Sequence, residues 1–177
     1  MVQTVGEALD RIRRDSRDEY EKGFWFENLT MRVLKDNPEY EIEKVQRWKD
    51  WEEREALTGL DGRDIGIDLV ARHKDGSWIA IQCKCHAEDH RLSKSDLNDF
   101  LVATQNSLYS MRWIVLTCDL TGPAEAVIRD GSPPISRIDF LRHLDDPISE
   151  EEAERPVRTP WPRQLETIVR TNGQRGL

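Results

Sequence analysis

The sequence has no long run of apolar residues, no cysteine-rich framework and no excess of positive charge. Without some 20 consecutive apolar residues it offers no membrane-spanning helix, and its N-terminus lacks the basic-then-apolar layout of a secretory signal. Three cysteines, an odd number without an export signal, indicate reduced thiols rather than a disulfide framework. These features predict a cytoplasmic protein that contacts no membrane.

The formal net charge of −8 argues against a strongly basic nucleic-acid coat. It leaves room for DNA binding in which local basic contacts are paired with an acidic metal site. The 177 residues suffice for one domain with a buried core but not for two of full size.

Apolar periodicity and turn residues predict an α/β fold. In chain order we expect a solvated helix at 5–17, a helix at 20–35, strands at 41–48, 65–72 and 78–85, a helix at 93–107, a strand at 113–118 that is buried on both faces, a helix opened by residues 121–124, and a strand at 135–140. Asp75-Gly76 makes the second and third strands a hairpin, and Ser93 with Asp96 forms a capping box for the third helix. A hairpin beside a strand–helix–strand unit implies a mixed central sheet flanked by helices.

The hairpin gathers polar side chains where apolar ones are expected. Alternation along 79–86 puts Gln82 and Lys84 on one face of the strand. Asp68, between apolar neighbours on the preceding strand, needs a cation or hydrogen-bond donors. The hairpin can bring these three side chains together, and Glu27 on the second helix is a candidate to join them.

This combination suits metal-assisted phosphodiester hydrolysis. A hard oxygen ligand such as Asp68 can hold Mg²⁺, which polarises a phosphate and activates a bound water. Lys84 can orient that water and stabilise charge in the transition state. The alternative is that Asp68 and Lys84 form an ordinary surface ion pair, contributing less than about 1 kcal/mol.

Two segments resemble a known active-site signature, that of Mrr-like PD-(D/E)xK nucleases. They are Gly66-Ile67-Asp68 and Ala80-Ile81-Gln82-Cys83-Lys84, with glutamine in place of the middle acidic residue. The helix motif Gly23-x-x-Phe26-Glu27-x-Leu29 is similar to the N-terminal helix of that branch. Together with Trp48-x-x-Trp51, these patterns resemble the nuclease domain at the N-terminus of Type ISP restriction-modification enzymes. The resemblance covers roughly residues 20–144 and implies a restriction-endonuclease-like fold.

The resemblance also implies a role for each residue in a Mg²⁺-dependent DNA endonuclease. Asp68 is the principal metal ligand and Lys84 the catalytic lysine. Gln82 takes the second motif position through its amide oxygen, Cys83 offers its backbone carbonyl to the metal, and Glu27 supports the ion from its helix. Mn²⁺ is expected to replace Mg²⁺, and the uncharged Gln82 favours one ion over two.

The C-terminal segment extends the resemblance beyond the nuclease. We expect the nuclease domain to span residues 1–146, and 147–177 to be an acidic linker followed by the start of a helicase-like domain. Residues 162–168 resemble the opening segment of superfamily 2 helicases, although Arg163 occupies the usual histidine position and no phosphate-binding loop follows. The chain is therefore expected to be one part of a larger enzyme. The implied partners are double-stranded DNA, helicase or translocase, methyltransferase and target-recognition domains, and a second nuclease domain for cleavage.

Some residues admit two readings. Cys83-x-Cys85-His86 could suggest zinc, but His86 points away from the two thiols and core packing is favoured. Asp64 could reach the ion or end the preceding loop.

Other residues could contact DNA. His86, Arg91 and Lys94 could bind phosphates or lie on a solvated loop, and Trp48 and Trp51 could stack on a base or pack in the core. For the whole chain, the alternatives to a restriction nuclease are a catalytically silent DNA-binding or docking module and a structure-specific resolvase or exonuclease.

Overall fold

A five-stranded mixed sheet forms the centre of the computed structural model, which describes residues 3–148. In spatial order its strands are β2 (Ile42–Arg47), β3 (Leu69–His73), β4 (Trp78–Lys84), β6 (Tyr109–Leu116) and β8 (Ile135–Asp139). The strand β3 is antiparallel to both of its neighbours, β2 and β4, whereas β4, β6 and β8 are parallel. The predicted α/β class, the hairpin and the mixed sheet are confirmed.

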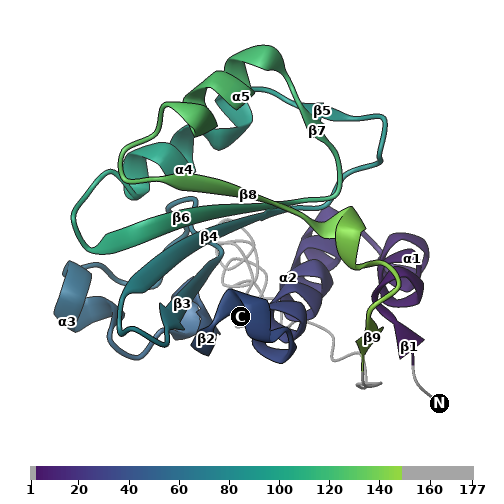
Figure 1. Ribbon diagram of the computed structural model, residues 1–177, viewed down its shortest axis with the longest axis horizontal. Helices are drawn as coiled ribbons and strands as arrows, with labels where there is room; N and C mark the ends of the chain where they lie inside the picture. Colours follow the sequence, from purple (N-terminus) through teal and green to yellow (C-terminus); the bar gives the residue numbers. More distant parts are fainter. Residues whose placement is uncertain (1–2, 149–177) are drawn as a thin grey trace, which may run out of the picture.

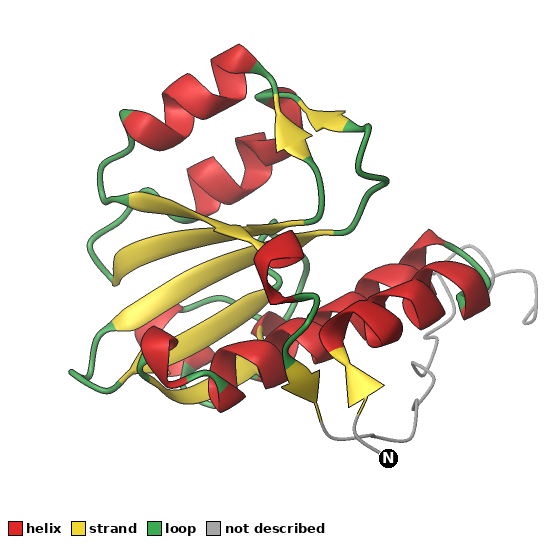
Figure 2. Ribbon diagram, turned by 45° about the vertical axis from the view of Figure 1, so that its right-hand side comes forward, coloured by secondary structure: helices red, strands yellow, loops and turns green. Residues whose placement is uncertain are grey.

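Helices cover both faces of this sheet (Figure 1). The helices α1 (Val5–Asp15) and α2 (Glu19–Asp36) pack on one face, and the shorter α4 (Asn98–Ala103) and α5 (Gly122–Arg129) pack on the other. The remaining short elements are α3 (Arg54–Thr58), the 3₁₀ turns η1 (Pro38–Tyr40), η2 (Trp48–Asp50), η3 (Ser95–Leu97) and η4 (Phe140–His143), and the strand pairs β1 (Gln3–Thr4) with β9 (Pro147–Ile148) and β5 (Arg91–Leu92) with β7 (Asp119–Leu120). Figure 2 shows α1 and α2 lying together along one side of the sheet.

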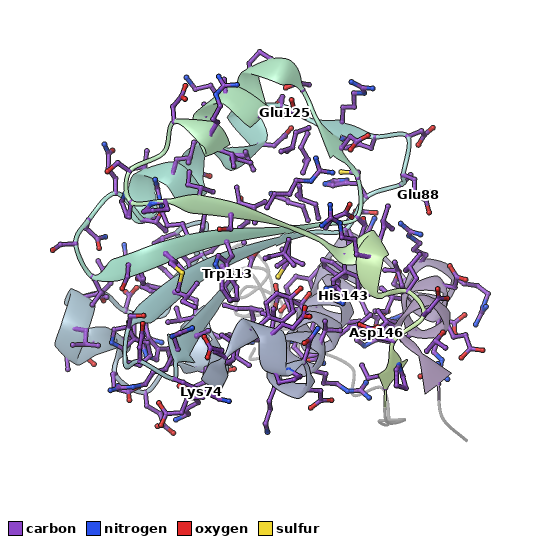
Figure 3. All side chains as sticks on the ribbon, viewed as in Figure 1. Lys74, Glu88, Trp113, Glu125, His143 and Asp146 are labelled. Carbon is purple, nitrogen blue, oxygen red and sulfur yellow. The ribbon has the colours of Figure 1, made fainter. Side chains whose placement is uncertain are left out.

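The core is divided by the sheet into two layers, as the alternation along β4 predicts. Ile79 and Ile81 face α1 and α2, together with Trp113, which Figure 3 labels on that side of the sheet. Ala80 and Ile114 face α4 and α5. The central strand β6 is buried on both faces from Arg112 onward, as predicted for a strand inside a parallel sheet.

The sequence predicted a solvated first helix, but one face of this helix is buried in the structure. Val5, Leu9 and Ile12, spaced at four and three residues, are buried against α2 and the sheet. Thr4 caps the helix in a reciprocal pair of hydrogen bonds with Glu7. The charged residues occupy only the outer face.

The helix expected at 93–107 is shorter than predicted. Asp96 accepts a hydrogen bond from the Ser93 backbone at 2.7 Å, one half of the expected capping box, but the chain first makes a 3₁₀ turn and α4 begins only at Asn98. It ends at Ala103, where the Thr104 hydroxyl turns back to bond the Phe100 carbonyl at 2.7 Å. The strand β6 correspondingly begins at Tyr109, four residues earlier than predicted.

The strand expected from residue 65 begins only at Leu69, because the chain bends at Gly66. This glycine has φ of +92°, and a Cβ there would lie 2.8 Å from the backbone of Asp99 and Phe100. Ile67 therefore packs toward α4 and α5 while Leu69 packs toward α1 and α2. Simple alternation along this segment would put Ile67 and Leu69 on one face, and the bend at Gly66 separates them.

Hydrogen bonds tie the last described residues to the start of the chain. Val5 donates its backbone N–H to Asp146, and Pro147–Ile148 pairs with Gln3–Thr4. Tyr40 and Asp146 bond the two ring nitrogens of His143, and Figure 3 shows His143 and Asp146 close together there. The acidic linker and the helicase-like segment expected beyond this point lie outside the described residues. Among residues 3–148, no helix has the length and apolar character needed to cross a bilayer.

Candidate active site

Asp68 lies where β3 and β4 separate. The strand pairing runs from Arg72 opposite Trp78 to Leu69 opposite Ile81. One residue further, the Asp68 backbone still donates to the Ile81 carbonyl at 3.0 Å, and its Oδ2 accepts the Cys83 N–H at 2.7 Å. A carboxylate thus takes the place of a backbone acceptor and is fixed against the carboxyl end of β4.

Burial raises the pKa of Asp68 from 3.8 to about 6. The Cys83 N–H and the positive charge of Lys84 act in the opposite direction, while the nearby Asp64 raises the pKa further. The surroundings therefore leave the ionised carboxylate short of stabilising partners. A bound cation would supply what this carboxylate lacks.

Gln82 is a buried polar residue with half of its amide unsatisfied. Its Nε2 donates to the Gly66 carbonyl at 3.3 Å, whereas its Oε1 has no hydrogen-bond partner and is shielded from solvent. A buried acceptor without a partner costs about 1–3 kcal/mol. Such an atom is open to a bound water or a ligand, and an oxygen of this kind suits a hard cation.

Lys84, two residues further along β4, is half-buried. Its positive charge lowers the pKa of both Asp68 and Asp96, so its amine is within electrostatic reach of both carboxylates. Within residues 3–148, Lys84 has no ion pair at 4.0 Å or less. Its ammonium is near Asp68 but does not form an ion pair with it.

Glu27 projects from α2 toward the same region and is already paired. Its Oε2 accepts from the Arg47 Nε at 2.9 Å. Burial and the negative charge of Asp68 nevertheless raise the pKa of Glu27 from 4.5 to about 7, against the opposing effects of Arg47 and Lys49. The effect of one carboxylate on the other shows that Glu27 and Asp68 lie within electrostatic reach.

A groove of about 350 Å³ runs between α2 and the segment that leads into β3. Its walls are formed by one face of α2, the end of β2 and the approach to Asp68: Glu19, Tyr20, Gly23, Phe24, Glu27, Arg47, Trp48, Lys49, Gly62, Asp64, Ile67 and Asp68. Of the predicted site residues, Asp68 and Glu27 line the groove, whereas Gln82, Cys83 and Lys84 on β4 are not among its lining residues. Asp64 also lines it, and its Oδ1 accepts the Gly66 N–H at 2.9 Å, the loop-ending role that the sequence favoured.

The available donors fit a magnesium ion better than a zinc ion. No group of three His, Cys, Asp or Glu side chains in the described part of the chain could hold a metal. The oxygens that these residues offer are the Asp68 carboxylate, the unpartnered Gln82 Oε1 and the Cys83 backbone carbonyl. Burial raises the pKa of the Cys83 thiol well above its usual value, so its sulfur stays protonated and is a poor ligand. Mg²⁺ prefers oxygens and retains several waters, so it needs few protein ligands.

Sequence reasoning missed Arg47, which contacts Glu27 and lines the groove. Nothing local in the sequence connects these residues, which are 20 positions apart, because they meet only when α2 docks on β2. For Trp48 and Trp51 the core-packing reading is confirmed. They are 3% and 2% exposed, their ring centroids lie 5.9 Å apart, and the ring of Trp51 also contacts that of Trp78 at 4.9 Å.

Comparisons with known proteins show the family and the fold of the chain. A family model described as "Restriction endonuclease" (Mrr_cat_2) matches residues 35–154, a range that includes Asp68, Gln82, Cys83 and Lys84 but not Glu27. A solved structure described as an ATP-dependent Type ISP restriction-modification enzyme, LlaBIII, bound to DNA superposes with a TM-score of 0.63 at 23% identity. The alignment covers 97% of this chain and 11% of that one. No curated protein gives a significant match. The restriction-endonuclease-like fold expected from the sequence is confirmed.

Proposed function

The chain belongs to the restriction endonuclease family, and on that basis we propose that it is a Mg²⁺-dependent DNA endonuclease domain with Asp68, Gln82 and Lys84 at its catalytic centre. One observation carries the proposal. At the carboxyl end of β4, a carboxylate with a raised pKa and a buried amide oxygen without a partner lie beside one half-buried lysine. Such a set costs stability unless something binds there.

The ion's protein ligands are the Asp68 carboxylate, the Gln82 Oε1 and the Cys83 backbone carbonyl. Bound Mg²⁺, or Mn²⁺ in its place, supplies a Lewis acid that polarises the scissile phosphate and lowers the pKa of a bound water. The Cys83 N–H holds the Asp68 carboxylate in position through a 2.7 Å hydrogen bond. Lys84 orients the attacking water with its ammonium and stabilises the negative charge that develops on the phosphate.

Glu27 supports the site from α2 rather than from the sheet. It lines the groove in which the DNA backbone is proposed to lie, next to Lys49 and Arg47. Those cations offset the acidic site locally, so the chain can bind DNA despite its overall charge of −8.

We further propose that the chain works within a larger enzyme. It corresponds to 11% of the length of the Type ISP structure, which leaves room for translocase, methyltransferase and target-recognition domains elsewhere in the same polypeptide. Residues 1–146 then form the nuclease, and 147–177 link it to a helicase-like domain. Cutting both strands is expected to require two nuclease domains.

A catalytically silent docking module is the second candidate, favoured by a specific observation. Glu27 is neutralised by Arg47, and no three-acid cluster exists among residues 3–148. On this reading the domain binds DNA in a salt-dependent manner without binding divalent metal.

Nicking of supercoiled plasmid in Mg²⁺ tests the proposal. We expect Asp68→Asn and Lys84→Ala to lower the nicking rate by about 100- to 1,000-fold, as is usual when an electrostatic catalytic group is lost. The matched controls are Asp130→Asn and Lys74→Ala, which remove the same charges from exposed positions, and we expect both to cut like the wild type. Equal nicking by all five proteins would eliminate the proposal, and Mg²⁺-independent DNA binding without nicking would favour the silent module.

A further inference from the structure

The guanidinium of Arg47 lies against the carboxylate of Glu27, with its Nε 2.9 Å from the Glu27 Oε2. We propose that Arg47 acts as a resident cation that restricts the active site to a single metal ion. The inference rests on the proposed function, because it assumes that Asp68 and Gln82 hold the first ion.

Arg47 is held by several contacts on one turn of α2. Its Nε donates to Glu27 at 2.9 Å, and its Nη2 donates to the Phe24 carbonyl at 2.9 Å and to the Asn28 Oδ1 at 2.6 Å. Its guanidinium carbon lies 3.9 Å from the centre of the Phe24 ring, within cation–π range. The side chain is only 12% exposed. A guanidinium fixed in this way presents a permanent charge at one place, as a bound ion does.

The balance of charges around the groove disfavours the binding of a second ion. Four carboxylates line the groove, those of Glu19, Glu27, Asp64 and Asp68, while the second motif position on β4 holds the neutral Gln82. Against these four negative charges stand Arg47 and Lys49 on the groove wall and Lys84 near Asp68. One divalent ion at Asp68 already makes the balance positive. A second would have to displace Arg47 from Glu27 and would meet a repulsive field.

A purely structural role for the Arg47–Glu27 ion pair predicts a different result for metal binding. If Arg47 only fastens α2 to the end of β2, its removal lowers stability and leaves the number of bound ions unchanged. Metal stoichiometry therefore separates the two roles, whereas activity alone does not.

Calorimetric titration of the metal-free full chain with Mn²⁺ is the test. We expect one ion per wild-type chain. In Arg47→Gln the freed Glu27 should hold a second ion, and the first should bind about tenfold tighter because a nearby unit positive charge is gone. Electron paramagnetic resonance of the same samples should show coupling between two Mn²⁺ ions only in this variant.

Two further variants act as controls. Arg72→Gln removes an equal charge from the neighbouring strand β3, where Arg72 pairs with Glu43 at 3.4 Å, so it should still bind one ion. Glu27→Gln combined with Arg47→Gln removes the carboxylate together with its counter-charge, and should return the stoichiometry to one.

Two results would overturn the inference: two ions in the wild type, or one ion in a folded Arg47→Gln protein with an unchanged dissociation constant. The wild-type titration decides even if Arg47→Gln does not fold, since a second wild-type ion is incompatible with a resident cation. Failure of the proposed function looks different, because the wild type would then bind no Mn²⁺, or Asp68→Asn would bind it equally well.

Discussion

Two regions of the central sheet bury polar side chains, and they do so in opposite ways. On β6, Arg112 is 3% exposed, and the protein itself satisfies its guanidinium. The Pro133 carbonyl accepts from Nε at 3.2 Å and from Nη2 at 2.6 Å, and the Thr104 hydroxyl accepts from Nη1 at 3.4 Å. These bonds tie the loop before β8 to the sheet and to the end of α4.

At the carboxyl end of β4, the protein does not supply hydrogen-bond partners for all of the buried polar groups. The Gln82 Oε1 is buried without a partner, and the carboxyls of Asp68 and Glu27 have pKa values raised to about 6 and about 7. The difference shows that a protein can satisfy a buried polar group with its own hydrogen bonds or leave that group available to a ligand. Substitutions in the Arg112 region should cost stability and spare function, whereas those around Asp68 should cost function and spare stability.

The largest effect expected is on catalysis, in Asp68→Asn. Loss of the principal ligand should reduce Mg²⁺-dependent nicking by about 1,000-fold, while the metal-free protein becomes no less stable. Asparagine keeps an oxygen for the Cys83 N–H and adds no buried charge. Nicking rates and urea unfolding of the same preparation check both halves. An Asp68→Asn protein that loses stability together with activity would contradict the separation of the two regions.

Arg112→Met should produce the largest effect on stability. It leaves the partly buried Pro133 carbonyl without its two donors, and a hydrogen bond to a charged group contributes about 1.5–3 kcal/mol. We expect a loss of about 3 kcal/mol in the free energy of unfolding and an unchanged Mn²⁺ affinity. Urea denaturation and metal titration measure the two quantities. Weakened metal binding in a folded Arg112→Met protein would contradict the separation of the two regions.

The metal-free wild type should lose stability as the pH rises. The folded pKa of Asp68 is about 6 against 3.8 unfolded, and that of Glu27 is about 7 against 4.5. The folded protein therefore holds both protons longer, and its stability falls between about pH 4 and pH 7. The Asp68 shift of about two units corresponds to nearly 3 kcal/mol, so we expect Asp68 to contribute about 2 kcal/mol after allowance for partial exposure. Urea midpoints in chelator should show this fall in the wild type and a smaller one in Asp68→Asn. Saturating Mg²⁺ should remove the Asp68 contribution.

The smallest effect expected is in Gln82→Glu, which restores a carboxylate at the second motif position. An added negative charge next to the ion should tighten Mn²⁺ binding by about tenfold, or about 1.4 kcal/mol. The same charge is costly to bury in the metal-free state, so that state should become less stable. Calorimetry with and without Mn²⁺ measures both. An unchanged affinity would show that residue 82 does not face the ion.

Much of the fold could be predicted because it depends on local patterns. The hairpin follows from Asp75-Gly76 between two apolar runs, and the buried strand follows from its continuous apolar sequence. The start of β3 could not be predicted, because it depends on the close approach of α4 to Gly66, two segments more than 30 residues apart in the chain. The buried face of α1 was hidden by the charge of its outer face.

Some residues of the candidate site could likewise be predicted from the sequence and others could not. Gln82 and Lys84 lie on β4, and Asp68 directly precedes β3. The short turn between these two strands is what brings Asp68 beside Cys83. The pairing of Glu27 with Arg47 depends on how α2 docks against β2, and no sequence pattern encodes that docking. The sequence therefore indicated the acid on the helix but not the cation that neutralises it.

The location of a bound ion tests the central claim most directly. Crystals of the wild type soaked in Mn²⁺ should give a single anomalous peak about 2.1 Å from an Asp68 carboxylate oxygen and a similar distance from the Gln82 Oε1. No peak there at saturating Mn²⁺, or a peak elsewhere that touches neither Asp68 nor Gln82, would contradict the account.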